Sequence, residues 1–277
     1  MRQDLEKSYS SNHSASTQPP RRRLQHVTDL LRGEVDSKMC TCVMVYACFL
    51  TGFTSAITFT ACYIWCGFQT GNVAQLGVAV ARTFQPGAIR GFHMSDKHAL
   101  CSLLSFLLGT SVGRIGDKIG NHTRKWLISA TIIQALMLMA AALTAHYGGT
   151  SGIALDRGDP SWTNPTSFAA LGFASASLGL QGIIGKRLNT QFATAVVLTT
   201  VWVELVNDPF LFALRRVDTR DHKAMSILAV FLGAFISKAL VDKIGSAGTL
   251  GIAAGLRFIG AWAWLAVPSK VRPPKAA

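Results

Sequence analysis

Two charged side chains lie inside apolar stretches of this sequence, where a charge is costly. Glu204 lies within VVLTTVWVELV and Arg257 within GIAAGLRFIGAWAWL. A charge at the centre of a membrane span costs about 2.5–3.5 kcal/mol on insertion scales, so such a residue usually faces a partner, a watery cavity or a substrate. We therefore expect Arg257 either to pair with Glu204 or Asp208 or to bind an anionic substrate. For Glu204 the alternatives are a transport role, a structural ion pair, or a solvated position at the membrane interface.

Uncharged polar residues interrupt other apolar stretches. The amides among them are Asn72, Gln75, Gln134 and Gln181, and most intramembrane amides simply hydrogen-bond between helices. The triplet Thr70-Gly71-Asn72 predicts a break in the chain, because Gly71 supplies backbone freedom and Asn72 or Thr70 can cap a helix that starts there. The free amides and the dipole of that helix would favour an anionic group.

No residue pattern indicates catalysis, a metal or a cofactor. The sequence holds no Ser-His-Asp, HExxH, P-loop or GxSxG arrangement, and its six cysteines lack the second pair that a zinc site needs. The formal charge is +13, but the basic residues stand at the ends of apolar runs, as in membrane loops. We therefore predict the lipid bilayer as a partner, and no nucleic acid.

Membrane-spanning helices must position these residues. The chain of 277 residues is 49% hydrophobic and only 15% charged, whereas soluble domains carry about 25% charged residues. A span needs roughly 20 apolar residues, and an open sheet or alternating barrel strand does not fit these runs. The fold class predicted is all-α and polytopic. Six segments meet or approach the length of a span: 39–65, 99–116, 126–147, 167–185, 225–240 and 249–267.

The stretch 72–84 is too short to cross a bilayer and too apolar for an ordinary loop. If it crossed, the basic connection 114–125 would face outside, against the positive-inside tendency. We expect a re-entrant half-helix, with unwound backbone at 69–71 close to Thr199 and Thr200. The alternative is a continuous helix kinked at Gly71. The same charge pattern predicts cytosolic termini, in the plasma membrane or another cellular membrane.

The two halves of the chain resemble each other. GFTSA at 52–56 returns as GFASA at 172–176, TGNVAQL at 70–76 aligns with TTVWVEL at 199–205, and DKIG occurs at 117–120 and 242–245. Three crossings per half would invert one half relative to the other, as in secondary transporters with a site near the midplane. The second half-helix is then expected near 192–207. Candidate site residues between the halves are Thr70, Gly71, Asn72, Gln75, Gln181, Thr199, Thr200, Glu204 and Arg257.

The expected organisation is a disordered cytosolic tail (1–38), two membrane halves (39–147 and 166–267) and a short cytosolic C-terminal tail (268–277). Within the membrane halves, LTGFTSAITF, FQTGNVAQLG, FLLGTSVGRIGDKIG and LGLQGIIGKRLNTQFATAVVLTTVWVEL are characteristic. On these residues the chain resembles the YoaK-like family of bacterial and fungal membrane proteins, domain of unknown function 1275, in its fungal type. The resemblance implies a multi-span membrane protein and no particular substrate. The first span of such proteins often carries an Asp where Ser55 lies here.

These patterns favour a secondary transporter of a small molecule or ion. The alternative is a membrane scaffold or accessory subunit that does not transport, and we expect no enzymatic activity. Whether the chain forms a homo-oligomer is left open by the sequence.

Overall fold

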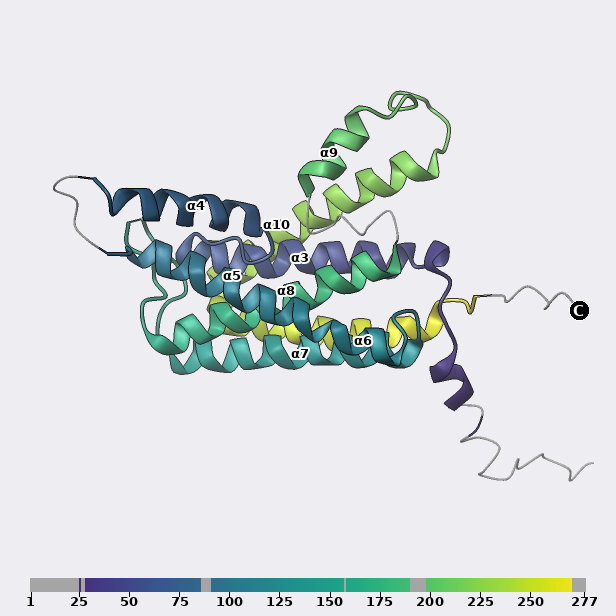
Figure 1. Cartoon of the computed structure of the whole chain (residues 1–277), viewed down its shortest axis with the longest axis horizontal. Helices are drawn as coiled ribbons and strands as arrows, with labels where there is room; N and C mark the ends of the chain where they lie inside the picture. The colour runs from purple at the N-terminus through teal and green to yellow at the C-terminus, as the bar shows by residue number, and fades with distance from the viewer. Residues whose placement is uncertain (1–24, 26–27, 86–90, 157, 190–197, 271–277) are drawn as a thin grey trace, which may run out of the picture.

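A computed structural model of the chain describes residues 25, 28–85, 91–156, 158–189 and 198–270 (Figure 1). These residues form helices and three isolated β-bridges, with no strand among them. Five helical segments are long and apolar enough to cross a membrane: Thr41–Cys62 (α3), Met94–Ile119 (α5, Met94–Val112, with α6, Arg114–Ile119), Arg124–Tyr147 (α7), Pro165–Leu188 (α8) and Asp218–Ala266 (α10). The predicted all-helical membrane class is confirmed. Most of the predicted N-terminal tail, most of the C-terminal tail and the start of the second predicted half-helix lie outside the described residues.

Helix α10 contains a break where the sequence predicts the boundary between two spans. Gly245 has φ 74° and ψ 173°, so residues 218–244 and 246–266 form two helical parts. At 1.5 Å per residue each part is about 30 Å long or more, enough for the hydrocarbon core of a bilayer. The chain turns back at this glycine, and the last part runs toward the C-terminus (yellow in Figure 1).

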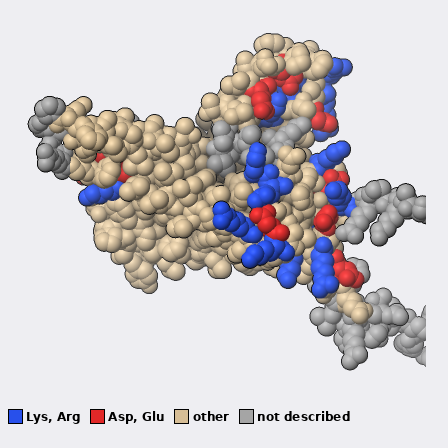
Figure 2. Space-filling model, viewed as in Figure 1, with Lys and Arg blue, Asp and Glu red and all other residues tan. Residues whose placement is uncertain are grey.

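The bundle has two distinct ends. At the first, which we call the terminal end, Val35 bridges to Ser269 and Glu34 to Thr123. At the opposite end, the loop end, the connection 148–164 covers the last turn of α3, where Ala154 N donates to Thr60 O. Lys and Arg gather at the terminal end, and a broad uncharged band separates it from the loop end (Figure 2). This distribution matches a protein that crosses a bilayer.

Capping residues explain where several helices begin. Thr123 accepts from Trp126 N at the start of α7, and Asn164 accepts from Ser167 N at the start of α8, with proline in the first turn. Helix α5 begins with a capping box, because Asp96 accepts from His93 N. Such side chains satisfy amides that have no partner within the helix.

Two pairs of glycines hold the long helices at backbone distance. A Cβ at Gly52 (α3) would lie 2.0 Å from Val230 O, and one at Gly233 (α10) 2.0 Å from Phe49 O. Likewise a Cβ at Gly109 (α5) would lie 2.0 Å from Ala176 O on α8. Gly179 on α8 makes the reciprocal contact, since a Cβ there would lie 2.1 Å from Phe106 O on α5. Small residues let membrane helices approach closely, where packing rather than the hydrophobic effect holds them together.

The stretch that the sequence left hard to place is a separate short helix, α4 (Gln69–Arg82). Helix α3 ends at Cys62 near the loop end, and Tyr63 is left-handed at φ 57°. Residues 63–68 then lead inward, because Gln69 reaches Ser102, well inside α5. The other end of α4 returns to the loop end, where Arg82 pairs with Asp96. A continuous helix through this region is therefore ruled out.

Candidate functional site

The start of α4 lies in a polar cluster that we call the junction cluster: Gln69, Asn72, Ser102 and Ser175, with the carbonyl of Cys66. Gln69 Nε2 donates to Cys66 O at 2.7 Å and to Ser102 Oγ at 3.1 Å. Asn72 Nδ2 donates to Gln69 Oε1 at 2.8 Å and to Ser102 Oγ at 3.3 Å. Ser102 Oγ lies 2.9 Å from Ser175 Oγ on α8. These bonds join α4, α5 and α8 near the middle of the bundle.

The structure corrects the expected roles of Thr70, Gly71 and Asn72. The chain is unwound at 63–68 and not at 69–71, and the residue before the helix is Phe68, which makes no side-chain cap. Asn72 lies one turn inside the helix, and its side chain does not cap the helix but bonds to Gln69 and Ser102. Thr70 and Gly71 are exposed, and a Cβ at Gly71 would meet nothing within 4 Å.

Gly67 lies in the unwound segment before α4, close to side chains of α3 and α8. A Cβ there would lie 2.9 Å from Ser55 Oγ and 3.0 Å from Leu178 Cδ1, so a larger residue would require these two side chains to shift. Ser55 is fully buried. A larger side chain at position 55 would need space that this backbone occupies.

A second polar site lies between α3, α7, α8 and the last part of α10. We call it the Arg257 cavity. It has a volume of about 30 Å³. Its polar lining residues are Tyr46, Thr131, Gln134, Gln181, Arg257 and Trp264, and apolar residues such as Ala47 and Ile184 complete the wall.

Arg257 is only 3% exposed, and its Nε and Nη2 have no hydrogen-bond partner among the described residues. The Oε1 atoms of Gln134 and Gln181 are also buried without a partner there. Gln181 is fixed in orientation, because its Nε2 donates to Ala47 O at 2.9 Å and to Thr51 Oγ1 at 2.6 Å. Buried polar groups are normally hydrogen-bonded, and unsatisfied ones cost free energy. Residues that carry unpartnered donors and acceptors therefore line this cavity together.

Neighbouring contacts hold the cavity in shape. Tyr46 donates its hydroxyl to Leu256 O at 2.7 Å, next to Arg257 in the chain. Gly260 leaves room for the Tyr46 ring, since a Cβ there would lie 2.7 Å from Cε1 of the ring. On the opposite side, Trp264 Nε1 donates to Thr131 Oγ1 at 3.0 Å.

The expected ion pair between Arg257 and Glu204 or Asp208 is wrong. Glu204 is on α9 (Leu198–Val206), its side chain is 47% exposed, and its carboxylate lies 3.7 Å from Lys223 Nζ. Asp208 accepts from Phe210 N. Glu204 therefore forms a half-exposed ion pair with Lys223 on α10.

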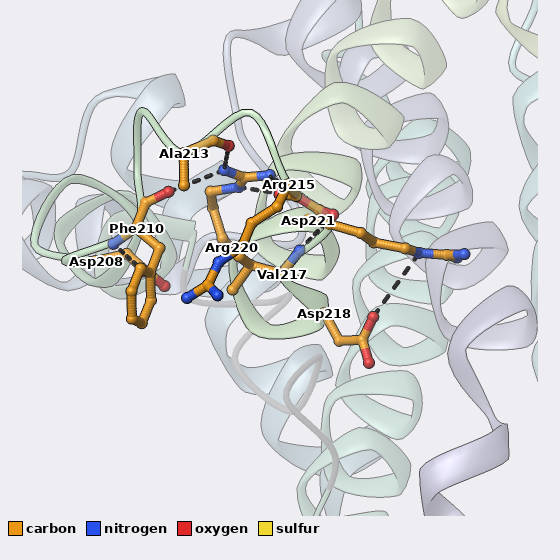
Figure 3. Close-up of polar contacts among 9 residues, drawn as sticks. Asp208, Phe210, Ala213, Arg215, Val217, Asp218, Arg220 and Asp221 are labelled. Carbon is orange, nitrogen blue, oxygen red and sulfur yellow. Dashed lines mark hydrogen bonds and ion pairs between the residues drawn. The ribbon is translucent and has the colours of Figure 1, made fainter.

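The connection from α9 to α10 is organised around Arg220 (Figure 3). Arg220 pairs with Asp221, which also accepts from Val217 N. Its guanidinium donates to the carbonyl oxygens of Phe210, Ala213 and Arg215. Arg220 thus holds together the loop that precedes α10.

The nine predicted site residues therefore fall into separate places. Gln181 and Arg257 meet at the cavity, whereas Asn72 belongs to the junction cluster. Gln75 is half-buried on α4, and Thr199 and Thr200 are exposed on α9. Sequence reasoning named Gln134 as an intramembrane amide without assigning it to a site, and missed Tyr46, Thr131 and Trp264. Their residue types fit ordinary helix packing, so only the tertiary arrangement distinguishes them.

The fold and these polar sites define a helical protein of the membrane class. Over residues 43–263 the sequence matches the family described as protein of unknown function (DUF1275), and the chain belongs to that family. No curated protein matches the chain. No solved structure matches it either.

Proposed function

We propose that this protein is a secondary transporter of a small molecule or ion, built from two inverted halves around the Arg257 cavity. The observation that carries the proposal is a cavity between helices of both halves, lined by residues that carry unpartnered buried polar atoms. A scaffold has no need of such a site, because unpaired buried polar groups destabilise a fold.

The packing of the helices supports the two-half arrangement. If α10 counts as two crossings, the first half holds α3, α5 and α7, and the second holds α8 and the two parts of α10. In this division α3 corresponds to α8, and α5 corresponds to the first part of α10. The close glycine contact between α3 and the first part of α10 then corresponds to the close glycine contact between α8 and α5. The contact of Tyr46 with the last part of α10 corresponds to that of Ser177 with Gln134 O on α7.

The half-helices follow the same exchange. Helix α4 follows α3 and packs on α5, and α9 follows α8 and packs on α10. Helix α4 runs along the side of the bundle toward the loop end, whereas α9 projects from the bundle together with the start of α10 (Figure 1). Inverted repeats with interrupted helices are typical of secondary transporters, in which substrate binds between the repeats.

The proposed orientation places the terminal end in the cytosol. The test uses a chain in which the six native cysteines are replaced. In it, Lys118→Cys on α6 should be labelled only from the cytosolic side. Asp156→Cys in the loop-end connection should be labelled only from outside. The physical reason is the bias of Lys and Arg toward cytosolic loops. Labelling of both positions from one side would contradict the six-crossing arrangement.

The transport function is tested by uptake into proteoliposomes against a panel of ions and metabolites. Ala47 lines the cavity, so Ala47→Phe should fill the site and reduce uptake of the transported solute by at least about tenfold, as expected for a blocked binding site. Ala239→Phe, at an exposed position on α10, is the matched control and should transport normally. No uptake of any solute by correctly inserted protein would instead favour the scaffold.

A further inference from the structure

We propose that the Arg257 cavity binds a small planar oxyanion, such as hydrogencarbonate, formate or nitrate. This inference rests on the proposed function and names the class of solute that the site would take. The unpartnered polar atoms of the residues that line the cavity, together with the size of the cavity, carry it.

The unpartnered donors of Arg257 are Nε and Nη2. In a guanidinium these two nitrogens direct hydrogens in parallel along one edge, within the plane of the group, and that edge matches two oxygens of a planar anion in two parallel hydrogen bonds. A spherical ion such as chloride cannot satisfy both donors equally well. The geometry therefore favours an oxyanion.

The charge environment points the same way. The cavity is lined by one cationic residue, Arg257, and by no Asp or Glu. A buried cation without a partner is costly, and a bound anion would supply the missing charge and hydrogen bonds. Gln181 Oε1 has no partner, and the other bonds of this amide fix it as an acceptor. A ligand that also carries a hydroxyl, as hydrogencarbonate does, would satisfy it.

Size limits the ligand. A water molecule needs about 10–15 Å³ of such space, so the cavity of about 30 Å³ holds the equivalent of two or three waters. This excludes sugars, nucleotides and lipid headgroups from the arrangement that the structure describes. It accommodates an ion of a few atoms.

The test measures binding by the purified full chain in detergent, through the rise in melting temperature and by titration calorimetry. The probes are the sodium salts of hydrogencarbonate, formate and nitrate, with chloride as the spherical ion and gluconate as an anion too large for the cavity. We expect the planar oxyanions to raise the melting temperature more than chloride does, and gluconate to have no effect.

Arg257→Gln should weaken oxyanion binding by at least about tenfold, because it removes the charged donors. The matched control is Arg187→Gln, which removes an exposed arginine paired with Asp117 at the terminal end, and it should bind like the original chain. If Arg257→Gln does not fold, Arg257→Lys keeps the charge and should lose the preference for planar oxyanions over chloride. Unchanged oxyanion affinity in Arg257→Gln, or unchanged selectivity in Arg257→Lys, would overturn the inference.

Binding and transport can fail separately. Oxyanion binding that depends on Arg257 without uptake into proteoliposomes would support the binding site and remove the transport function. Uptake of another solute that Arg257→Gln leaves intact would support transport and overturn the oxyanion assignment.

Discussion

Gly52→Ala is expected to prevent normal folding of this protein, although it adds a single methyl group. The new Cβ would lie 2.0 Å from Val230 O and 2.8 Å from Val230 C, which are backbone atoms of α10. No side-chain rotation can relieve that clash, so α3 and α10 must separate. Overpacking usually costs 1–3 kcal/mol, and we expect about 3 kcal/mol or more here because the obstacle is backbone.

Gly255→Ala is the matched control. Gly255 also lies in a helix, on the last part of α10, and a Cβ there would meet nothing within 4 Å. Alanine should be neutral or should stabilise that helix by up to about 1 kcal/mol, since glycine is the poorer helix former. Gel filtration and thermal unfolding in detergent measure both variants. A melting temperature of Gly52→Ala equal to that of Gly255→Ala would show that the glycine crossing is not tight.

Asp96→Asn is expected to release α4 from the bundle at the loop end. Asp96 is 1% exposed, and both of its carboxylate oxygens lie 3.1 Å from Arg82 Nη2 at the end of α4. Loss of one partner of a fully buried ion pair costs about 3–5 kcal/mol. Because the Arg82 side chain is 31% exposed, we expect a smaller loss, about 2–3 kcal/mol.

The control for Asp96→Asn is Asp242→Asn. Asp242 pairs with Lys238 one turn earlier on α10, and both side chains are about half exposed. Surface pairs of this kind contribute roughly 0.3–0.5 kcal/mol, so thermal unfolding should hardly change. In Asp96→Asn, a cysteine at Val78 on α4, exposed at the surface, should report changed mobility by spin labelling. The double variant with Arg82→Met should be no less stable than Asp96→Asn alone. Additive losses would mean that Arg82 and Asp96 stabilise the fold independently.

The sequence by itself determined the class of this protein and most of its helices. Apolar runs long enough to span a bilayer and basic residues at their ends are properties of composition and order, so they can be recognised without a fold. A short helix could also be expected at α4, since 72–84 is too short to span, although the helix begins at Gln69. The division of α10 at Gly245 also follows from sequence, because polar DKIG separates two apolar runs there.

The tertiary structure decided which polar residues meet. Gln181 and Arg257 share a cavity with Gln134 because α3, α7, α8 and α10 converge there, and no local pattern encodes that convergence. Glu204 looked like the natural partner of Arg257 from its apolar neighbours, but α9 packs along the first part of α10 and offers its carboxylate to Lys223. The break before α4 fell earlier than the Thr-Gly-Asn triplet suggested. At Gly67 the unwound segment passes close to the side chains of Ser55 and Leu178, and this arrangement exists only once α3 and α8 are packed.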